Sequence, residues 1–400
     1  MKNNRKKFSA MLIAPDIIEC RKNHQGILIA PFNDQKAKGI GYNISPSNLV
    51  YSIKKGVPQM IFDSEEGSYT YINPNDTVLI LSYEYIQTDS KIAGTFHSRV
   101  RNSAKGLGNV STTLDPGWKG MLLIAINNPT KKKIKLPITV KKDGKVERCS
   151  LITLVVFQND FSKKENHRIS FHLDNPPMRA DIWSELTAMP RKLLHNDKYQ
   201  KFQRFINQLI SFKPSDSSEM CKYKTILELI LKLEIALYSE KSEISEILFR
   251  TCMLELNQRI SMDDEELREK YTSLQKLIDN CYNRYNSFNQ IISVQRIKEK
   301  IDLIRDECKY LILCNEVEQI HEFITKNIEV WWEQATLSQF FDRYILPNLS
   351  AIIISVALCI MLLFGVNIEQ NGFLAKLIVS LSPILLSVLI NIFTIRKNRI

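Results

Sequence analysis

The sequence lacks any paired-cysteine motif. Its eight cysteines are scattered, no two form a Cys-x-x-Cys pair, and no cysteine–histidine spacing matches a zinc site. Such cysteines are typical of small core side chains in a reducing compartment. The N-terminus, MKNNRKKFSAMLIAPD, is basic but has too few apolar residues for a signal peptide. We therefore expect the N-terminal part to stay in the cytoplasm.

Proline and glycine are scarce between about residues 180 and 330, a stretch rich in Leu, Ile, Glu and Lys. Asn175-Pro176-Pro177 marks the boundary before it, because a residue preceding proline is disfavoured in a helix. A heptad pattern runs from Leu267 to Ile292, and a second phase begins at Val294. The phase break near Ser293 predicts either a kink or the end of one arm of a helical hairpin. We predict a helical, partly coiled-coil-like stalk over residues 178–330, packed within one chain or between chains.

Acidic residues are outnumbered by basic ones, 43 to 54, and the formal net charge is +11. This excess favours polyanionic partners such as nucleotide phosphates, nucleic acid or anionic lipid headgroups. A general bias toward surface lysine explains it equally well.

Charge is almost absent from two C-terminal segments, 345–366 and 373–395. Each is long enough to cross a hydrocarbon core as a helix, so we predict a two-helix transmembrane hairpin; buried core helices are the alternative. Segment 331–344, rich in aromatic residues, is predicted to be amphipathic and interfacial. Arg343 and Lys397 flank the spans, which places both termini in the cytoplasm and the chain in the inner membrane, with the lipid bilayer as a partner.

Residues 1 to about 165 carry short β-rich runs such as GILIAPF and GMLLIAINN, separated by turn residues. This spacing predicts an all-β sandwich or barrel. The fold class is therefore multi-domain: a β barrel, then an α-helical region, then two transmembrane helices.

The β-rich part resembles the dCTP deaminase and dUTPase superfamily over about 150 residues. The resemblance rests mainly on Leu114-Asp115-Pro116-Gly117-Trp118, which matches the Asp-Pro-Gly-Trp turn that follows the family's Arg-Ser-Ser turn. Gly41-Tyr42-Asn43-Ile44 resembles the family's Gly-Tyr-Asp-Leu strand, and Met11–Ile18 resembles the opening helix of the deaminases.

The resemblance implies roles for several residues. Asp115 matches the carboxylate that orients the attacking water beside Mg²⁺ in the pyrophosphatases, and Trp118 matches the aromatic side chain that packs on the deoxyribose. Arg99 matches the arginine of the phosphate-binding turn. Arg101 and Lys105 carry charge that could hold phosphate oxygens. A purely structural turn is the alternative for Asp115 and Trp118.

The sequence also departs from the family pattern. Val100 and Arg101 replace the two serines of the phosphate turn, and Asn43 replaces an aspartate. Ala125 stands where the deaminases have their catalytic glutamate, and the glycine-rich C-terminal arm of dUTPases is missing. These changes imply a nucleotide pocket whose chemistry is degenerate, as in a sensor.

Three functions remain open at this point. The first is an oligomeric membrane effector, a channel or pore in antiphage defence. It would sense a deoxynucleotide or a short DNA oligomer. By analogy it would be a trimer or tetramer with a nucleotide-synthesising partner enzyme. The second is a membrane-anchored pyrophosphatase that uses Asp115 and Mg²⁺, the one cofactor expected. The third is an anchored scaffold.

Overall fold

The computed structural model describes residues 10–109, 112–158, 179–187, 197–238, 243–260, 264–285 and 291–340. The chain divides into two compact units, Met1–Ile328 and Glu329–Ile400. Every contact between different elements that is discussed below lies within the first unit.

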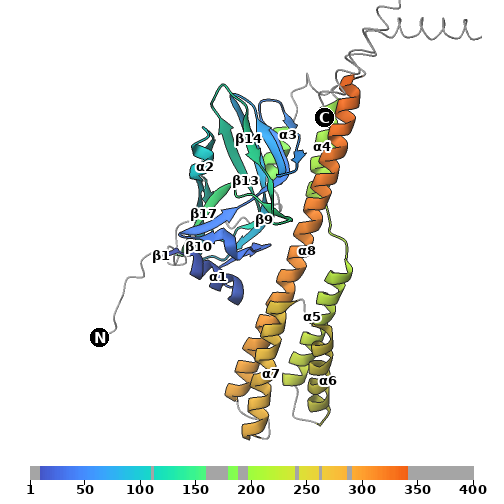
Figure 1. The fold of residues 1–400 in the computed structure, drawn as a ribbon. Coiled ribbons are helices and arrows are strands. Elements are labelled where there is room, and N and C mark those ends of the chain that lie inside the picture. Colours follow the sequence, from blue (N-terminus) through green and yellow to red (C-terminus); the bar gives the residue numbers. More distant parts are fainter. Residues whose placement is uncertain are drawn as a thin grey trace, which may run out of the picture. The chain divides into compact units, whose positions relative to one another are not determined.

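The described residues between Ala10 and Gln158 form a β domain built on two six-stranded sheets (Figure 1). The first sheet has the order β12–β10–β17–β4–β3, with β1 paired to β17, and the second has the order β11–β13–β9–β5–β6, with β2 paired to β9. The strands of the first sheet are β1 (Ala10–Leu12), β3 (Ala37–Lys38), β4 (Gly41–Ile44), β10 (Ile92–Ser98), β12 (Thr113–Leu114) and β17 (Ile152–Gln158). Those of the second are β2 (Ile27–Ala30), β5 (Pro46–Ser52), β6 (Val57–Pro58), β9 (Asp76–Thr88), β11 (Gly108–Asn109) and β13 (Lys119–Asn128).

Smaller elements complete the β domain. Strands β14, β8 and β7 form a three-stranded sheet, and β15 pairs with β16. Their bounds, with those of the short helices, are β7 (Phe62–Ser64), β8 (Gly67–Ile72), β14 (Ile134–Pro137), β15 (Thr139–Lys142), β16 (Lys145–Arg148), α1 (Ala14–Asn23), the 3₁₀ helix η1 (Asp34–Lys36) and α2 (Val100–Ser103).

Alternation along the strands explains why the two large sheets share one core. On β13, Ile124 and Ile126 are buried and belong to the core cluster, whereas Ala125 between them is half-buried. On β17, Ile152 and Leu154 join the same cluster. Successive side chains of a strand point to opposite faces, so each sheet turns one apolar face inward. The β part of the predicted fold class agrees with this arrangement.

The helical region follows the β domain. Its helices are α3 (Ala180–Thr187), α4 (Asp197–Ile210), α5 (Ser218–Tyr238), α6 (Glu243–Arg259), α7 (Glu265–Tyr285) and α8 (Ile291–Phe340). Apolar residues of both heptad phases, including Leu274 of α7 and Ile301 of α8, are buried in a single cluster. Helix α7 ends at Tyr285 and α8 begins at Ile291, so the change of helix comes a few residues before the predicted phase break near Ser293.

Helix α8 is fastened to the β domain by a buried carboxylate. Glu307 is 1% exposed and accepts two hydrogen bonds from Arg21 of α1, at 2.8 and 3.0 Å. His24 Nε2 lies 3.0 Å from the same carboxylate, and Lys270 of α7 forms an ion pair with it. Burial alone would raise the pKa of Glu307, but the bonds from His24 and Arg21 outweigh burial and hold that pKa well below its usual range.

A second set of contacts lies farther along α8. The ring of His321 stacks on Tyr83 of β9, with centroids 4.3 Å apart, and His321 Nε2 lies 2.7 Å from the Tyr83 carbonyl oxygen. Asn48 of β5 donates to the Thr325 hydroxyl at 2.9 Å. Burial lowers the pKa of His321 to about 3, so this imidazole is neutral at pH 7.

The predicted membrane spans need correction. In the described part of the chain, no helix combines the length and the apolar character required to cross a bilayer. Helix α8 has 50 residues, but charged side chains such as Arg305 and Glu307 recur along it. The segments predicted to span, 345–366 and 373–395, lie outside the described residues. The two-span fold class and the inner-membrane location are therefore withdrawn.

The domain boundaries at 165, 178 and 330 stay predictions, as does the interfacial segment 331–344. Residues 331–340 of that segment belong to α8, and 341–344 lie outside the described residues. Trp331 is 7% exposed and packs edge-on against Trp332, with ring centroids 5.0 Å apart.

Replacing Glu307 with glutamine should lower the free energy of unfolding by about 3–5 kcal/mol, because Arg21 and Lys270 would lose the buried carboxylate that pairs with both, and Arg21 would keep only the half-exposed Glu266 as a counter-charge. Urea unfolding measures this loss. Glu246→Gln, which breaks the exposed Glu246–Arg250 pair on α6, is the matched control and should cost less than about 0.5 kcal/mol. Equal losses in the two variants would contradict the buried-anchor assignment.

Acidification should weaken the fold through His321. Its folded pKa is lowered, so below about pH 6.5 the unfolded chain binds a proton that the folded chain does not, and stability falls as the pH falls. Between pH 6.5 and 5 this group should account for a loss of about 2 kcal/mol. Denaturation at several pH values in the parent and in His321→Gln measures it, and an unchanged pH dependence in the variant would refute the assignment.

Candidate functional site

The turn that begins at Arg99 is held by side chains as well as by its own backbone. Arg99 precedes α2, and its carbonyl oxygen accepts the backbone N–H groups of Asn102 and Ser103 at 2.9 and 3.1 Å. Its guanidinium donates from Nη1 to the Ser150 carbonyl oxygen at 3.1 Å. The buried Asn102 side chain donates to the Leu151 carbonyl oxygen at 2.8 Å. The turn is therefore fixed to the segment that leads into β17.

An open hollow of about 860 Å³ lies beside this turn, on the outer face of the first sheet. One row of side chains crosses its floor, because Asn43 of β4, Thr153 of β17 and His97 of β10 are paired in register. The Thr153 hydroxyl donates to Asn43 Oδ1 at 2.9 Å. The polar residues that line the hollow are Lys38, Asn43, His97, Ser98, Arg99, Arg101 and Thr153. Its apolar lining includes Met11, Ile40, Val100, Val155 and Phe157.

Positive charge gathers at the polar end of this hollow. Burial raises the pKa of the Cys149 thiol, and the charges of Lys36, Arg101, Arg99 and Lys105 act in the opposite direction. All four cations therefore lie close enough to Cys149 for their charges to be felt there. Lys36 is also paired with the buried Glu84, at 3.0 Å. Arg99, Arg101 and Lys105 remain as the group best suited to an anionic ligand.

The Asp115–Trp118 segment forms a tight turn. The Trp118 backbone N–H donates to the Asp115 carbonyl oxygen at 3.3 Å, and Gly117 has a φ of 75°. Proline followed by glycine with positive φ is typical of a type II turn. The Trp118 side chain is 8% exposed, and its indole N–H donates to the Gly120 carbonyl oxygen at 3.1 Å. In a single chain the indole thus packs mainly into the core.

The two predicted halves of the site do not meet within one chain. Leu114 pairs with Gly94 of β10, whereas Arg99 follows the far end of the same strand. At about 3.3 Å per residue, the Asp115 turn and the Arg99 turn are separated by roughly 20 Å along β10. The structure brings Asn43, Arg99, Arg101 and Lys105 to one end of the first sheet and leaves Asp115 and Trp118 at the other.

Few of the positions at which the resemblance predicts catalytic residues hold reactive side chains. Ala125 lies on β13 opposite Leu79 of β9, and a methyl group cannot transfer a proton. Among the residues with described positions, no group of three His, Cys, Asp or Glu side chains could hold a metal ion. Mg²⁺ is often held by one or two carboxylates together with substrate phosphates, so Asp115 fits such a role only when phosphates are present.

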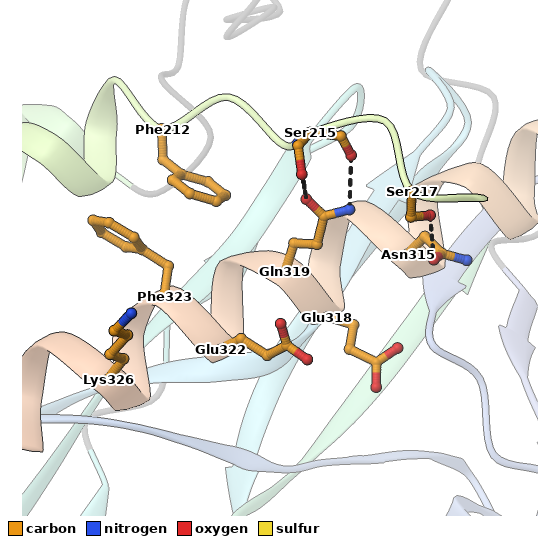
Figure 2. A pocket seen from close by; sticks show the side chains of 9 residues that line it. All are labelled: Phe212, Ser215, Ser217, Asn315, Glu318, Gln319, Glu322, Phe323 and Lys326. Carbon is orange, nitrogen blue, oxygen red and sulfur yellow. Dashed lines mark hydrogen bonds between the residues drawn. The ribbon is translucent and has the colours of Figure 1, made fainter. Parts of the chain in front are cut away.

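A second hollow, of about 510 Å³, lies between α8 and the segment that follows α4 (Figure 2). Phe212 and Phe323 face each other there, with ring centroids 4.6 Å apart. Gln319 bonds to the backbone of Ser215 through both its amide oxygen and its amide nitrogen, at 2.8 and 2.9 Å. The charged residues that line this second hollow are Glu318, Glu322 and Lys326. Two carboxylates against one ammonium disfavour phosphate, so the first hollow is the better candidate.

Sequence reasoning missed several residues of the first hollow. Lys38, which pairs with Gly41 across β3 and β4, lines it, and so do His97 and Ser98. The sequence could have indicated these residues, because His97 and Ser98 directly precede Arg99 and Lys38 lies three residues before the Gly41–Ile44 motif. Cys149, which does not line the hollow, gave no signal in the sequence, because only the fold brings the segment around Ser150 to Arg99.

Comparisons with known proteins agree with the resemblance. The chain is 27% identical over 115 residues to a dCTP deaminase of Thermococcus kodakarensis, which covers 29% of this chain and 71% of that protein. It is 26% identical over 116 residues to a probable deoxyuridine 5′-triphosphate nucleotidohydrolase of Sulfolobus islandicus rod-shaped virus 1, covering 29% and 70%. No family profile matches the chain. The β domain is dCTP deaminase-like and dUTPase-like.

The solved structures that resemble this chain include the following two. One is a 2′-deoxycytidine 5′-triphosphate deaminase from Agrobacterium tumefaciens, with 7% identity, a TM-score of 0.29, and coverage of 38% of this chain and 49% of that one. The other is a dUTPase of EIAV, with 21% identity, a TM-score of 0.22, and coverage of 36% and 90%.

Proposed function

We propose that the β domain binds a deoxynucleotide, with the phosphates at the Arg99 turn and the rest of the molecule in the adjacent hollow. The observation that carries this proposal is that Arg99 and Arg101 both line the hollow, with Lys105 four residues after Arg101 in the chain. Guanidinium groups suit phosphate oxygens because their N–H donors match them in geometry and charge. A volume of about 860 Å³ lies within the range of small-molecule sites.

The named activities of the relatives support a deoxynucleotide rather than another phosphate ester. Deamination is not part of the proposal, because Ala125 replaces the glutamate that the resemblance requires. A pore or channel is not part of it either, since that role depended on the withdrawn membrane spans.

A complete site in this proposal needs two copies of the chain. The Asp115 turn and the Arg99 turn lie at opposite ends of β10, so one ligand of nucleotide size does not reach both in one subunit. A closed ring of copies can bring the Asp115 turn of one copy to the Arg99 turn of the next. This arrangement fits a trimer, and a tetramer would serve as well.

A hydrolytic version of the same site is the second candidate. It is favoured by Asp115, which the chain retains in an Asp-Pro-Gly-Trp turn. A carboxylate there would polarise an attacking water, and Mg²⁺ bound with the phosphates would neutralise charge on them. The binding-only version needs neither step.

Removing one guanidinium should weaken nucleotide binding. Arg99→Ala or Arg101→Ala should raise the Kd for dUTP or dCTP by roughly 10–100-fold, because a hydrogen bond to a charged group is worth about 1.5–3 kcal/mol. Calorimetry at one fixed ionic strength measures this, since phosphate contacts are screened by salt. Lys141→Ala, an exposed lysine of β15, is the control and should bind as the parent does. Unchanged affinity in both arginine variants would remove the phosphate site from this turn.

Mixing two variants separates the two versions of the function. If the site hydrolyses dUTP with Mg²⁺, Arg99→Ala and Asp115→Asn should each abolish pyrophosphate release. Co-assembled copies should regain about a quarter of the parental rate, because a quarter of randomly formed interfaces pair two intact turns. Absence of turnover in the parent, with dUTP bound, selects the binding-only version. Full loss in the mixture, despite an active parent, would contradict the shared site.

A further inference from the structure

A segment of three residues, Arg148 to Ser150, connects the candidate phosphate site to helix α8. On the site side, Arg99 donates to the Ser150 carbonyl oxygen at 3.1 Å. Asn102, from the same turn, donates to the Leu151 carbonyl oxygen at 2.8 Å. The turn therefore cannot shift toward a ligand without pulling on this segment.

Arg148, two residues before Ser150, contacts two β-domain residues, Tyr83 and Asn48, that themselves contact α8. Its guanidinium carbon lies 4.5 Å from the centre of the Tyr83 ring, and its Nη1 donates to Asn48 Oδ1 at 2.8 Å. Tyr83 in turn stacks on His321, and Asn48 donates to Thr325. His321 and Thr325 are four residues apart on α8, so they lie on one face of that helix.

These contacts are made by groups with little freedom to adjust. Arg148 is half-buried, and burial lowers the pKa of its guanidinium. His321 is 5% exposed and neutral, and its Nε2 position is fixed by the Tyr83 carbonyl. When one such group moves, its packed neighbours must move with it. A neighbour that stayed in place would leave a polar atom without a hydrogen-bond partner, which costs free energy.

We propose that the Arg148–Ser150 segment couples ligand occupancy at the Arg99 turn to the packing of α8 on the β domain. This inference rests on the proposed function for the identity of the ligand, but the coupling itself can be examined without one. Coupling of two sites is reciprocal, so a change on α8 alters the Arg99 turn just as a ligand at the turn alters α8.

The ligand-free arm of the test uses Cys149 as the reporter, because it lies within the segment and is half-buried. His321→Ala and the milder Thr325→Val should each increase the rate at which N-ethylmaleimide labels Cys149 by about threefold or more, since loosening the segment exposes the thiol. Peptide mass spectrometry separates Cys149 from the other cysteines. Glu322→Gln, at an exposed neighbour of His321 on α8, is the control and should label as the parent does. Parental labelling rates in both folded test variants would overturn the coupling.

The second arm adds dUTP as the probe and follows hydrogen exchange of α8 amides between residues 314 and 328. In the parent, saturating dUTP should change this exchange. In Arg148→Met the affinity for dUTP should stay within about twofold of the parent while the effect on α8 disappears. Binding without any change on α8 in the parent would refute the coupling and leave the proposed function intact. Absence of dUTP binding would refute the proposed function, and the Cys149 labelling would then decide the coupling alone.

Discussion

The burial of one carboxylate constrains much of this structure. Glu307 lies almost entirely out of water, and a bare charge there would be unstable unless cations and hydrogen bonds surrounded it. Arg21 and His24 from the β domain and Lys270 from α7 meet at this point, so three separate parts of the chain are fixed around one side chain. Helix α8 then continues along the β domain to Tyr83 and Asn48, about 20–27 Å farther on at 1.5 Å per residue. The orientation of α8 relative to the candidate site follows from this anchor.

The excess of basic residues is used in two different ways. Arg21, Lys36 and Lys270 face carboxylates within the fold and leave little charge for a ligand. Arg101 is exposed and lines an open hollow together with Arg99, and Lys105 is also exposed. The same residue types therefore hold the fold together in one place and are proposed to bind an anion in another. Net charge alone cannot separate these uses, because it does not show which cations already have partners.

The parts of the candidate site that could be predicted from the sequence were those that lie within short local motifs. Asp115 to Trp118 identified a turn, and proline followed by glycine favours that geometry in most contexts. The resemblance pointed to Arg99 through its place before that motif, and its role in binding phosphate stays a prediction. The 20 Å between the two turns was not predictable, since it depends on the antiparallel pairing of β10 with β12 and not on sequence separation. Cys149 was missed for the same reason.

The helical region shows a similar division. The heptad pattern from Leu267 predicted buried positions on α7, because apolar spacing reports directly on one helix face. It did not reveal Glu307, His321 or Thr325 as contacts to the β domain, since polar residues on a helix are usually solvent-exposed. Hydropathy likewise indicated membrane spans at 345–366 and 373–395, and the described helices do not support that fold class.

We propose, above all, that the Arg99 turn holds a deoxynucleotide. Native mass spectrometry of the gently purified full chain tests it most directly, followed by denaturation and identification of any released small molecule. We expect deoxynucleoside phosphate to be released from the parent and to be strongly depleted in an Arg99→Ala, Arg101→Ala double variant of unchanged fold. Equal amounts of nucleotide retained by the parent and the double variant would contradict this proposal, and so would a parent that takes up none after incubation with dUTP, dCTP, dATP, dGTP or dTTP.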